Sequence, residues 1–294
     1  MDRTPTVSVL LPAWHAQDTV AQAVRDILNQ EAISLELIAI HQGGPDATLR
    51  ALQDVTDPRF RLVQLQEPDT AAALEAGRAL VRGEWIARID ADDRCAPTRL
   101  VEQLRYAEAT GALVVPCQVE AFPAGREQLV AWQNALVHHQ EMAAERFVEM
   151  PWFTATALFR AEALARVGGW RSGPFQEDYD LVVRLFAAGV RTEKLPAVRY
   201  RWQIHPGQDT WRWSRDRVRA QKAAWLDLPA DAYVAGTGRS LSEWAALLGL
   251  PAVPLDPRHP ELLPPGFPVL VFGAAVVRAR LRAALGQRPH LFVA

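Results

Sequence analysis

Three carboxylates, Asp90, Asp92 and Asp93, stand within four positions of this chain, directly after the apolar run 85–89. Carboxylates so close together raise one another's pKa unless a positive charge lies among them. One explanation is a helix start, because Pro97 suits a first helical turn and acidic residues favour the positive end of the helix dipole. The other is a site for a cation or a phosphate group. The triplet alone is consistent with both.

Two further clusters carry groups of related chemistry. Glu177 and Asp178 follow a glycine-rich stretch, "GGWRSGPFQ", and begin an amphipathic helical pattern. Arg201 and His205 lie at the end of a later strand-like segment, before a Pro-Gly turn. Metal-assisted transfer from a diphosphate requires such parts: oxygen ligands for Mg²⁺ or Mn²⁺, a carboxylate base, and cationic groups that meet the leaving phosphates.

The first half of the chain alternates strand-like and helical segments. Short, apolar, β-branched runs predict buried strands, and the segments between them have helical spacing. This alternation predicts an α/β fold with a mostly parallel sheet and helices on both faces. Ligands of such sheets bind outside the carboxyl ends of the strands. Asp90 follows the fourth strand, so the triplet is expected at a ligand crevice. The predicted strands are 7–11, 35–40, 61–65, 85–89 and 112–115.

The pattern predicts four parts along the chain. Residues 1–210 form the main domain, and residues 211–250 a helical extension. Residues 251–268 contain seven prolines and predict a stiff, extended linker, because proline restricts its own backbone and the residue before it. Residues 269–294 predict a small strand–helix–strand unit. Such a unit cannot cover both sheet faces alone, so we expect it to dock on the main domain or on a second copy of the chain.

The composition restricts the classes of function. The chain has 294 residues, 49% hydrophobic and 22% charged, as in a soluble globular protein. A formal net charge of −2 argues against nucleic-acid binding, which needs a basic face. The polar start "MDRTPT" has no secretory signal, and the two cysteines form no disulfide framework. The most apolar run, 267–277, is shorter than the about 20 residues that span a bilayer.

These features predict a cytoplasmic location. A basic stretch with Trp211, Trp213 and Trp225 leaves open a peripheral contact with the cytoplasmic face of a membrane.

In five segments the sequence resembles the family 2 glycosyltransferases, which have the GT-A fold. "TVSVLLPAWHAQDTVAQAVRDILNQ" is similar to the family's first strand and helix, and "GEWIARIDADDRCAPTRL" to its D-x-D-D segment. "FRAEALARVGGW" and "EDYDLVVRLFAAG" resemble its acceptor-side stretch and catalytic acid pair, and "YRWQIHPG" its closing Tyr-Arg and His. The resemblance covers about residues 6–210. It implies a Rossmann-like GT-A domain and an inverting, metal-dependent transfer of a sugar from a nucleotide-diphosphate sugar to an acceptor hydroxyl.

The resemblance also implies a role for each matched residue. Asp92 would bind the Mn²⁺ or Mg²⁺ that bridges the donor diphosphate, and Asp90 would contact the ribose or the water shell of the metal. Asp178 would deprotonate the acceptor hydroxyl with support from Glu177. His205 would be a further metal or phosphate contact. The other nucleotide-sugar contacts would come from Pro12, Ala13, Trp14, His41 and Ala91.

The sequence departs from the family's pattern at three places. His41 and Gln42 stand where the family carries two acids, the first of which holds the nucleotide base. An imidazole or an amide can still hydrogen-bond a base edge. Leu74 and Glu75 replace an Arg-Asn pair, and Thr154 stands where an acceptor-side histidine is expected.

These departures keep a second function open, a degenerate relative that binds a nucleotide sugar or a partner without turnover. Phosphoryl transfer by a haloacid-dehalogenase-like domain fits less well, because Arg94 stands where that mechanism needs Thr or Val. The acceptor, whether a glycan, a lipid-linked group or a protein, and a homodimer also stay open.

Overall fold

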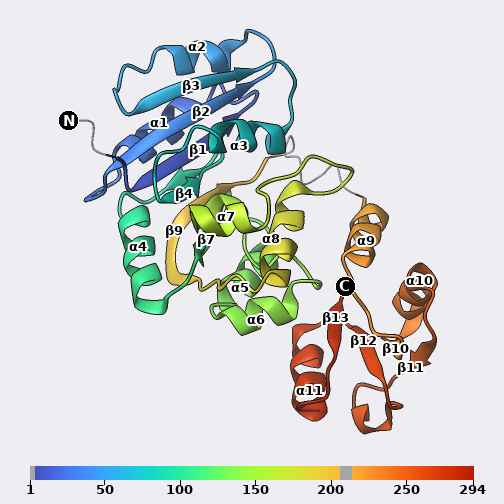
Figure 1. The fold of residues 1–294 in the computed structure, drawn as a ribbon. Coiled ribbons are helices and arrows are strands. Elements are labelled where there is room, and N and C mark those ends of the chain that lie inside the picture. The colour runs from blue at the N-terminus through green and yellow to red at the C-terminus, as the bar shows by residue number, and fades with distance from the viewer. Residues whose placement is uncertain (1–3, 206–213) are drawn as a thin grey trace. The chain divides into compact units, whose positions relative to one another are not determined.

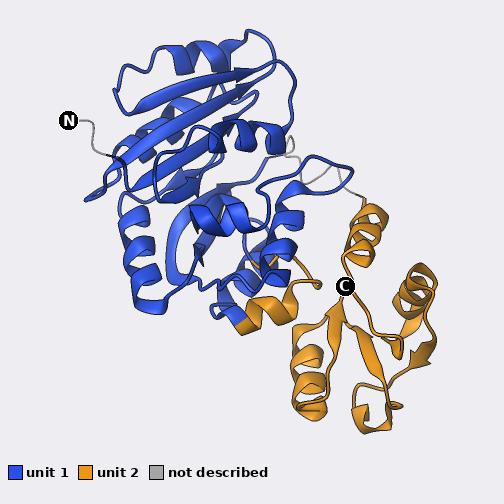
Figure 2. Ribbon diagram, in the orientation of Figure 1, with its two compact units in different colours: residues 1–139, 152–211 blue, residues 140–151, 212–294 orange. Residues whose placement is uncertain are grey.

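The computed structural model describes residues 4–205 and 214–294. The chain divides into two compact units (Figure 2). Unit 1 comprises residues 1–139 and 152–211, and unit 2 comprises residues 140–151 and 212–294.

The larger sheet of unit 1 has six strands in the order β3-β2-β1-β4-β8-β6 (Figure 1). The strands β3, β2, β1 and β4 are parallel to one another, and β8 runs antiparallel to β4 and β6. Each strand predicted in the first half of the chain is present, so the mostly parallel α/β fold is confirmed. The strands are β1 (Val7–Ala13), β2 (Leu35–Gln42), β3 (Phe60–Leu65), β4 (Trp85–Arg88), β6 (Val114–Val115) and β8 (Leu158–Arg160).

Helices cover both faces of this sheet. The side chains of α1 and α4 share one buried cluster with Val9 and Leu11 of β1. On the other face, Gly77 of α3 comes so near the sheet that a Cβ would lie 2.9 Å from Leu10 and 2.8 Å from Ile40. Only glycine allows this close approach without displacing those side chains. The helices are α1 (Val20–Leu28), α2 (Ala47–Gln53), α3 (Thr70–Arg78) and α4 (Arg99–Thr110).

A second sheet of unit 1 holds the loop that follows β4. Strand β9 (Leu195–Gln203) lies between β5 (Arg94–Cys95) and β7 (Cys117–Phe122), antiparallel to β5 and parallel to β7. Because β5 comes directly after the acidic triplet, this sheet connects the triplet to the end of β9, where His205 follows. The other helical segments of unit 1 are α5 (Glu127–Ala135), η1 (Thr154–Thr156), α7 (Ala161–Arg166) and α8 (Glu177–Ala187).

Unit 2 has a parallel four-stranded sheet in the order β11-β10-β12-β13. Most of α6 (His139–Glu145) also belongs to this unit. The remaining elements are α9 (Arg215–Ala224), β10 (Ala232–Gly236), α10 (Gly238–Leu248), β11 (Ala252–Pro254), η3 (Pro260–Leu262), β12 (Phe267–Val271), α11 (Ala275–Leu285) and β13 (Leu291–Val293).

This architecture corrects the organisation predicted for the last third of the chain. Residues 251–268 are not a linker, because they contain β11 and the start of β12. The prolines at 251 and 254 flank or end a three-residue edge strand, where a sheet tolerates proline. Residues 211–250 contain β10 as well as helices, and the strands of 269–294 pair in one sheet with β10. The predicted strand–helix–strand unit is therefore half of a larger sheet domain.

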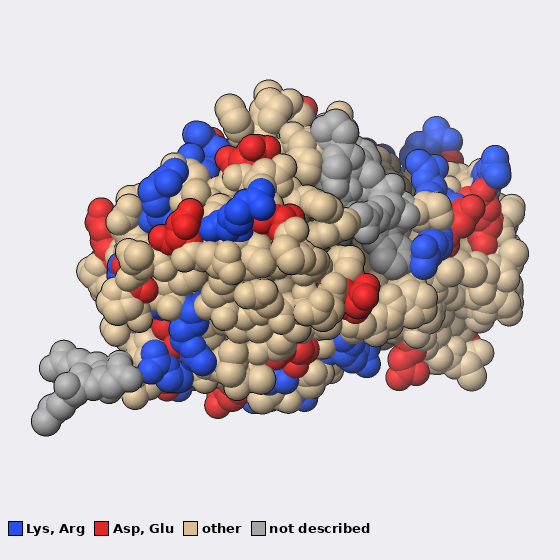
Figure 3. All heavy atoms as spheres, turned by 90° about the horizontal axis from the view of Figure 1, so that it is seen from above, with Lys and Arg blue, Asp and Glu red and all other residues tan. Residues whose placement is uncertain are grey.

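The described surface carries charges of both signs. On the face in Figure 3, acidic and basic side chains alternate without a broad basic field. Within residues 4–205 and 214–294, no helix has both the length and the hydrophobicity that crossing a bilayer requires. Trp211 and Trp213, which left a membrane contact open, lie outside the described residues.

Within unit 2, Glu145 connects the segment 140–151 to helix α11. Its two carboxylate oxygens accept hydrogen bonds from Nε of Arg278 and Nη2 of Arg282, each at 2.9 Å. The side chains of Glu145 and Arg278 are 6% and 3% exposed. A charge pair this deep is destabilising when one member is lost, because the other stays buried and uncompensated.

We therefore expect Glu145→Ala to lower the free energy of unfolding of unit 2 by about 3–5 kcal/mol. Hydrogen exchange of the β12 and β13 amides in increasing urea measures this loss. Arg258→Ala is the matched control, because it removes an ion pair with Asp256 on the exposed surface and should have no measurable effect. Equal exchange in the Glu145→Ala variant and the wild type would contradict the expectation.

Candidate active site

The carboxyl edge of the parallel strands brings together the first group of predicted site residues. Ala13, at the end of β1, pairs with His41 of β2. Strand β4 ends at Arg88, and Asp90 follows two residues later. Pro12 and Ala13 are buried within the sheet, whereas Trp14 is half-buried just beyond it. The predicted nucleotide-sugar contacts therefore lie along one edge, as the strand order requires.

A buried arginine, Arg88, joins two of the predicted site acids. Its Nε and Nη2 lie 2.9 and 2.8 Å from Oδ1 of Asp90. Its Nη1 donates to Oδ1 of Asp178 and, at 2.6 Å, to Oγ1 of Thr154. Burial lowers the pKa of Arg88, but the surrounding carboxylates, Asp178 foremost, outweigh burial and raise this pKa above its ordinary value. Arg88 is therefore the positive charge that the acidic triplet requires.

Arg88 is not among the site residues predicted from the sequence. A usable signal was present, because alternation along an extended chain places residues 88 and 90 on the same side. An arginine inside the otherwise apolar run 85–89 needs a countercharge once it is buried. Asp90 is the nearest acid on that side.

Asp90 lies between positive and negative neighbours. Burial raises its pKa, Arg88 opposes this effect, and the charges of Asp92 and Asp178 add to it, so that the pKa of Asp90 reaches about 6. The side chain is nevertheless 34% exposed. A carboxyl group in this state responds strongly to a further cation or hydrogen-bond donor, because either one favours its ionised form.

The first turn of α8 carries the second pair of predicted site acids. Asp178 is 23% exposed and contacts Arg88, while Glu177 is half-buried and adds negative charge near the same guanidinium. The N-terminal end of a helix attracts negative charge, so the first turn of α8 suits two carboxylates. The site thus combines an acid that follows β4 with an acid from α8.

A buried ion pair fixes α8 to the loop before it. Asp180, whose side chain is fully buried, accepts hydrogen bonds from Nε of Arg171 at 3.1 Å and from Nε of Arg184 at 2.7 Å. Arg184 also donates to the carbonyl of Gly169 at 2.8 Å. Asp180 therefore holds the helix that carries Asp178 against the glycine-rich stretch.

Asp92 and His205, which the sequence predicts as metal ligands, lie next to each other. Oδ2 of Asp92 lies 2.9 Å from Nε2 of His205, and both side chains are partly exposed. Within the described ranges, no group of three or more His, Cys, Asp and Glu side chains could hold a metal ion. Two protein ligands nevertheless suit a Mg²⁺ or Mn²⁺ ion that takes its other oxygen ligands from water and phosphate. A carboxylate and an imidazole are both ligands of Mn²⁺-type ions, so the residues present fit such an ion.

Asp93, the third acid of the triplet, has a structural role. It is 2% exposed, and its two oxygens accept hydrogen bonds from the Tyr200 hydroxyl and the Gln203 amide, each at 2.7 Å. Burial, with the charges of Asp92 and Asp90, raises the pKa of Asp93 well above its ordinary value. The turn that carries Asp92 is thereby bound to β9, which leads to His205.

His41 lies at the predicted base-binding position but faces the protein. It is fully buried, and its Nε2 lies 2.9 Å from Oδ1 of Asp46, the N-cap residue of α2. Its Nδ1 is buried with no hydrogen-bond partner. A nucleotide base would reach this nitrogen only after a local rearrangement.

The residues at the other two departures from the family pattern are buried or make defined contacts within the protein. Glu75 of α3 accepts a hydrogen bond from the backbone of Trp170 at 2.7 Å and pairs with Arg78. Leu74 is fully buried. Thr154, the third departure, is one of the partners of Arg88.

The sequence pattern of glycosyl transferase family 2 matches residues 8–168 of this chain. The succinoglycan biosynthesis protein ExoO of Rhizobium meliloti is 26% identical over 244 residues, which cover 76% of this chain and 68% of that protein. The putative glycosyltransferase EpsE of Bacillus subtilis is 29% identical over 216 residues, which cover 68% of this chain and 74% of that protein.

Solved structures share the fold at low sequence identity. Staphylococcus aureus TarS, solved in complex with UDP-GlcNAc, superposes with a TM-score of 0.61 at 14% identity, over 83% of this chain and 70% of that chain. The mannosyltransferase PcManGT of Pyrobaculum calidifontis, solved with GDP-Man and Mn²⁺, gives a TM-score of 0.60 at 21% identity, over 76% of this chain and 64% of that chain. Both are GT-A glycosyltransferases, so the GT-A fold is confirmed.

Arg88→Lys tests the cluster around Arg88. Lysine keeps the charge, but one ammonium group cannot reproduce the forked contacts to two carboxylates and a hydroxyl. We expect the free energy of unfolding of unit 1 to fall by about 1.5–3 kcal/mol, the usual value of a hydrogen bond to a charged group. Urea unfolding measures the loss. Arg160→Lys, at a more exposed pair with Glu84, is the control, and a loss as large in the control would refute a special role for Arg88.

Proposed function

Because the chain belongs to glycosyl transferase family 2 and is a glycosyltransferase, we propose that it catalyses an inverting, metal-dependent reaction. In this reaction a sugar passes from a nucleotide-diphosphate sugar to an acceptor hydroxyl. The observation that carries the proposal is the cluster in which Arg88 contacts both Asp90 and Asp178. It brings the D-x-D segment and the acid pair of α8 to one place. That is the arrangement an in-line displacement needs, with the donor on one side and a base on the other.

The donor end of the site is assigned to the D-x-D turn and His205. Asp92 and His205 would hold Mn²⁺ or Mg²⁺, which when bound neutralises the charge that develops on the leaving nucleoside diphosphate. Asp90, with its raised pKa, would accept hydrogen bonds from the ribose hydroxyls. Pro12, Ala13, Trp14 and Ala91 would line the nucleoside pocket, and His41 would join them only after a local rearrangement. The solved complexes of TarS with UDP-GlcNAc and of PcManGT with GDP-Man and Mn²⁺ support a donor of this class.

The acceptor end is assigned to Asp178. As the oxygen of the acceptor bonds to the anomeric carbon, the bond from that carbon to the donor phosphate breaks, and the hydroxyl proton passes to a carboxylate oxygen of Asp178. An ion pair with Arg88 fixes the position of Asp178 before the reaction. Glu177 adds negative charge beside the same guanidinium.

Binding without turnover is the second candidate function, and one observation favours it. His41 is fully buried against Asp46, so the usual base contact is absent from this conformation. A protein that binds a nucleotide sugar loosely and passes it on would tolerate this difference. Measured turnover separates the two functions.

Asp178→Asn tests the proposed base. The amide has a similar shape but cannot accept the proton, so turnover should fall by about 10² to 10⁴ while donor affinity is retained. Release of nucleoside diphosphate measures turnover, and calorimetry measures affinity. Glu127→Gln, a change at an exposed acid in the first turn of α5, is the control and should be silent. Near-normal turnover of the Asp178→Asn variant, or a product that retains the anomeric configuration of the donor, would show that the mechanism is wrong.

Asp92→Ala tests the proposed metal dependence. A ligand at 100 times its dissociation constant stabilises its protein by about 2.7 kcal/mol. In the wild type we expect Mn²⁺ to increase the thermal shift produced by UDP- or GDP-sugars. The Asp92→Ala variant should lose this increase, while Asp54→Ala, at an exposed acid that ends α2, should keep it. An unchanged Mn²⁺ effect in the Asp92→Ala variant would exclude Asp92 as a ligand.

A further inference from the structure

A pocket of about 210 Å³ opens beside Asp92. One wall comes from Asp18 and Thr19 before α1 and from Gln22 in its first turn. Asp92 forms part of the lining, so a molecule in this pocket lies next to the proposed donor site. The rest of the lining comes from the sheet β5-β9-β7.

Strand register places the sheet residues of this pocket on one face. Arg94 of β5 pairs with Arg201 of β9, which in turn pairs with Glu120 of β7. Two residues further along, Gln203 pairs with Phe122. Since side chains two residues apart point the same way, Phe122 and Gln203 share a face with the charged row.

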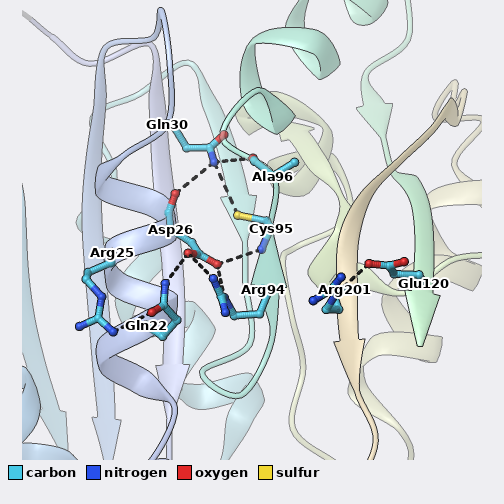
Figure 4. Close-up of polar contacts among 9 residues, drawn as sticks. All are labelled: Gln22, Arg25, Asp26, Gln30, Arg94, Cys95, Ala96, Glu120 and Arg201. Atoms are coloured by element: carbon cyan, nitrogen blue, oxygen red, sulfur yellow. Dashed lines mark hydrogen bonds and ion pairs between the residues drawn. The ribbon is translucent and has the colours of Figure 1, made fainter. Parts of the chain in front are cut away.

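Acidic partners neutralise the two arginines. Arg94 donates to both oxygens of Asp26, at 2.6 and 3.1 Å, and Arg201 donates to Glu120 at 2.7 Å (Figure 4). Asp26 and Glu120 lie behind the lining, and the lining itself contains the carboxylates of Asp18 and Asp92. Four carboxylates around two guanidinium groups disfavour an anionic occupant such as a free phosphate, because its charge would be repelled.

An exposed aromatic ring gives the pocket its apolar surface. Phe122 is 55% exposed, and the guanidinium carbon of Arg201 lies 5.4 Å from the centre of its ring. Both hydrogen-bond donors and hydrogen-bond acceptors surround the ring. The amide of Gln22, for example, is bonded to Asp26 and Arg25 and still has one N–H and one lone pair to offer.

We propose that this pocket binds one pyranose ring of a glycan acceptor, with the ring stacked on Phe122 and its hydroxyls bonded to the amides and carboxylates of the lining. A pyranose has C–H groups on its faces and hydroxyls around its edge, which matches an aromatic surface inside a polar rim. The volume suits a single small polar unit, since drug-sized ligands occupy pockets of about 300 Å³ and more. The inference rests on the proposed function, because Asp92 connects the pocket to the donor site, and it narrows the acceptor to a saccharide.

Methyl glycosides of glucose, galactose, mannose and N-acetylglucosamine test the pocket directly. Their binding to the full chain is followed by saturation-transfer NMR without any nucleotide, so the result does not depend on transfer. We expect at least one glycoside to bind with a millimolar dissociation constant. Phe122→Ala should weaken the affinity for the glycoside about tenfold, because the variant loses the contact with the aromatic ring and the apolar area that this contact buries. Phe122→Trp should restore the affinity, and Val198→Ala, at an exposed site on β9 outside the pocket lining, should leave it unchanged.

Three results would overturn the inference. They are no glycoside binding to the wild type, equal binding in the Phe122→Ala variant whose thermal unfolding is native-like, and displacement of the glycoside by inorganic phosphate. Nucleotide-sugar binding, measured separately by the Mn²⁺-dependent thermal shift, tells whether the proposed donor function fails as well. A protein that binds donor but no glycoside therefore refutes the saccharide subsite alone.

Discussion

The site depends on one buried charge, the guanidinium of Arg88. Without it, the carboxylates of Asp90 and Asp178 would repel each other across a partly dehydrated space. With it, an acid that follows β4 and an acid that begins α8 stay close together. The arginine is 4% exposed and cannot leave without exposing both carboxylates to their mutual repulsion. The distance between the two halves of the site is therefore set by an ion pair.

The sequence predicts where the acidic residues lie better than it predicts the role of each one. The apolar strand before Asp90 places the acidic triplet at the carboxyl edge of the sheet, and the helical pattern after Glu177 places the second acid pair at the start of a helix. Asp93 looks equivalent to Asp92 in the sequence. Only tertiary pairing with Tyr200 and the Gln203 backbone distinguishes the buried structural acid from the exposed one. A local sequence pattern does not indicate which distant residues will donate hydrogen bonds to a carboxylate.

The last third of the chain shows a different limit. Seven prolines between 251 and 268 predict an extended linker. The local part of this prediction is sound, because proline does favour an extended backbone. A proline-bounded segment can also form a short edge strand when a neighbour supplies the hydrogen bonds. Strand β10 is that neighbour for residues 252–254. The pairing between β10 and β11 joins segments that a helix separates, so it is invisible to a local pattern.

The hydrogen bonds of Asp93 have a further consequence for the assembly of the site. They attach the turn of Asp92 to β9, and therefore to the segment that ends in His205. Two groups held in this way lose little conformational entropy when a third partner binds between them, since most of their freedom is already spent in folding. Asp178 belongs to a different helix, held by its own ion pairs to Arg171 and Arg184. The helix of Asp178 can therefore change in evolution without disturbing the hydrogen-bonded pair of Asp92 and His205.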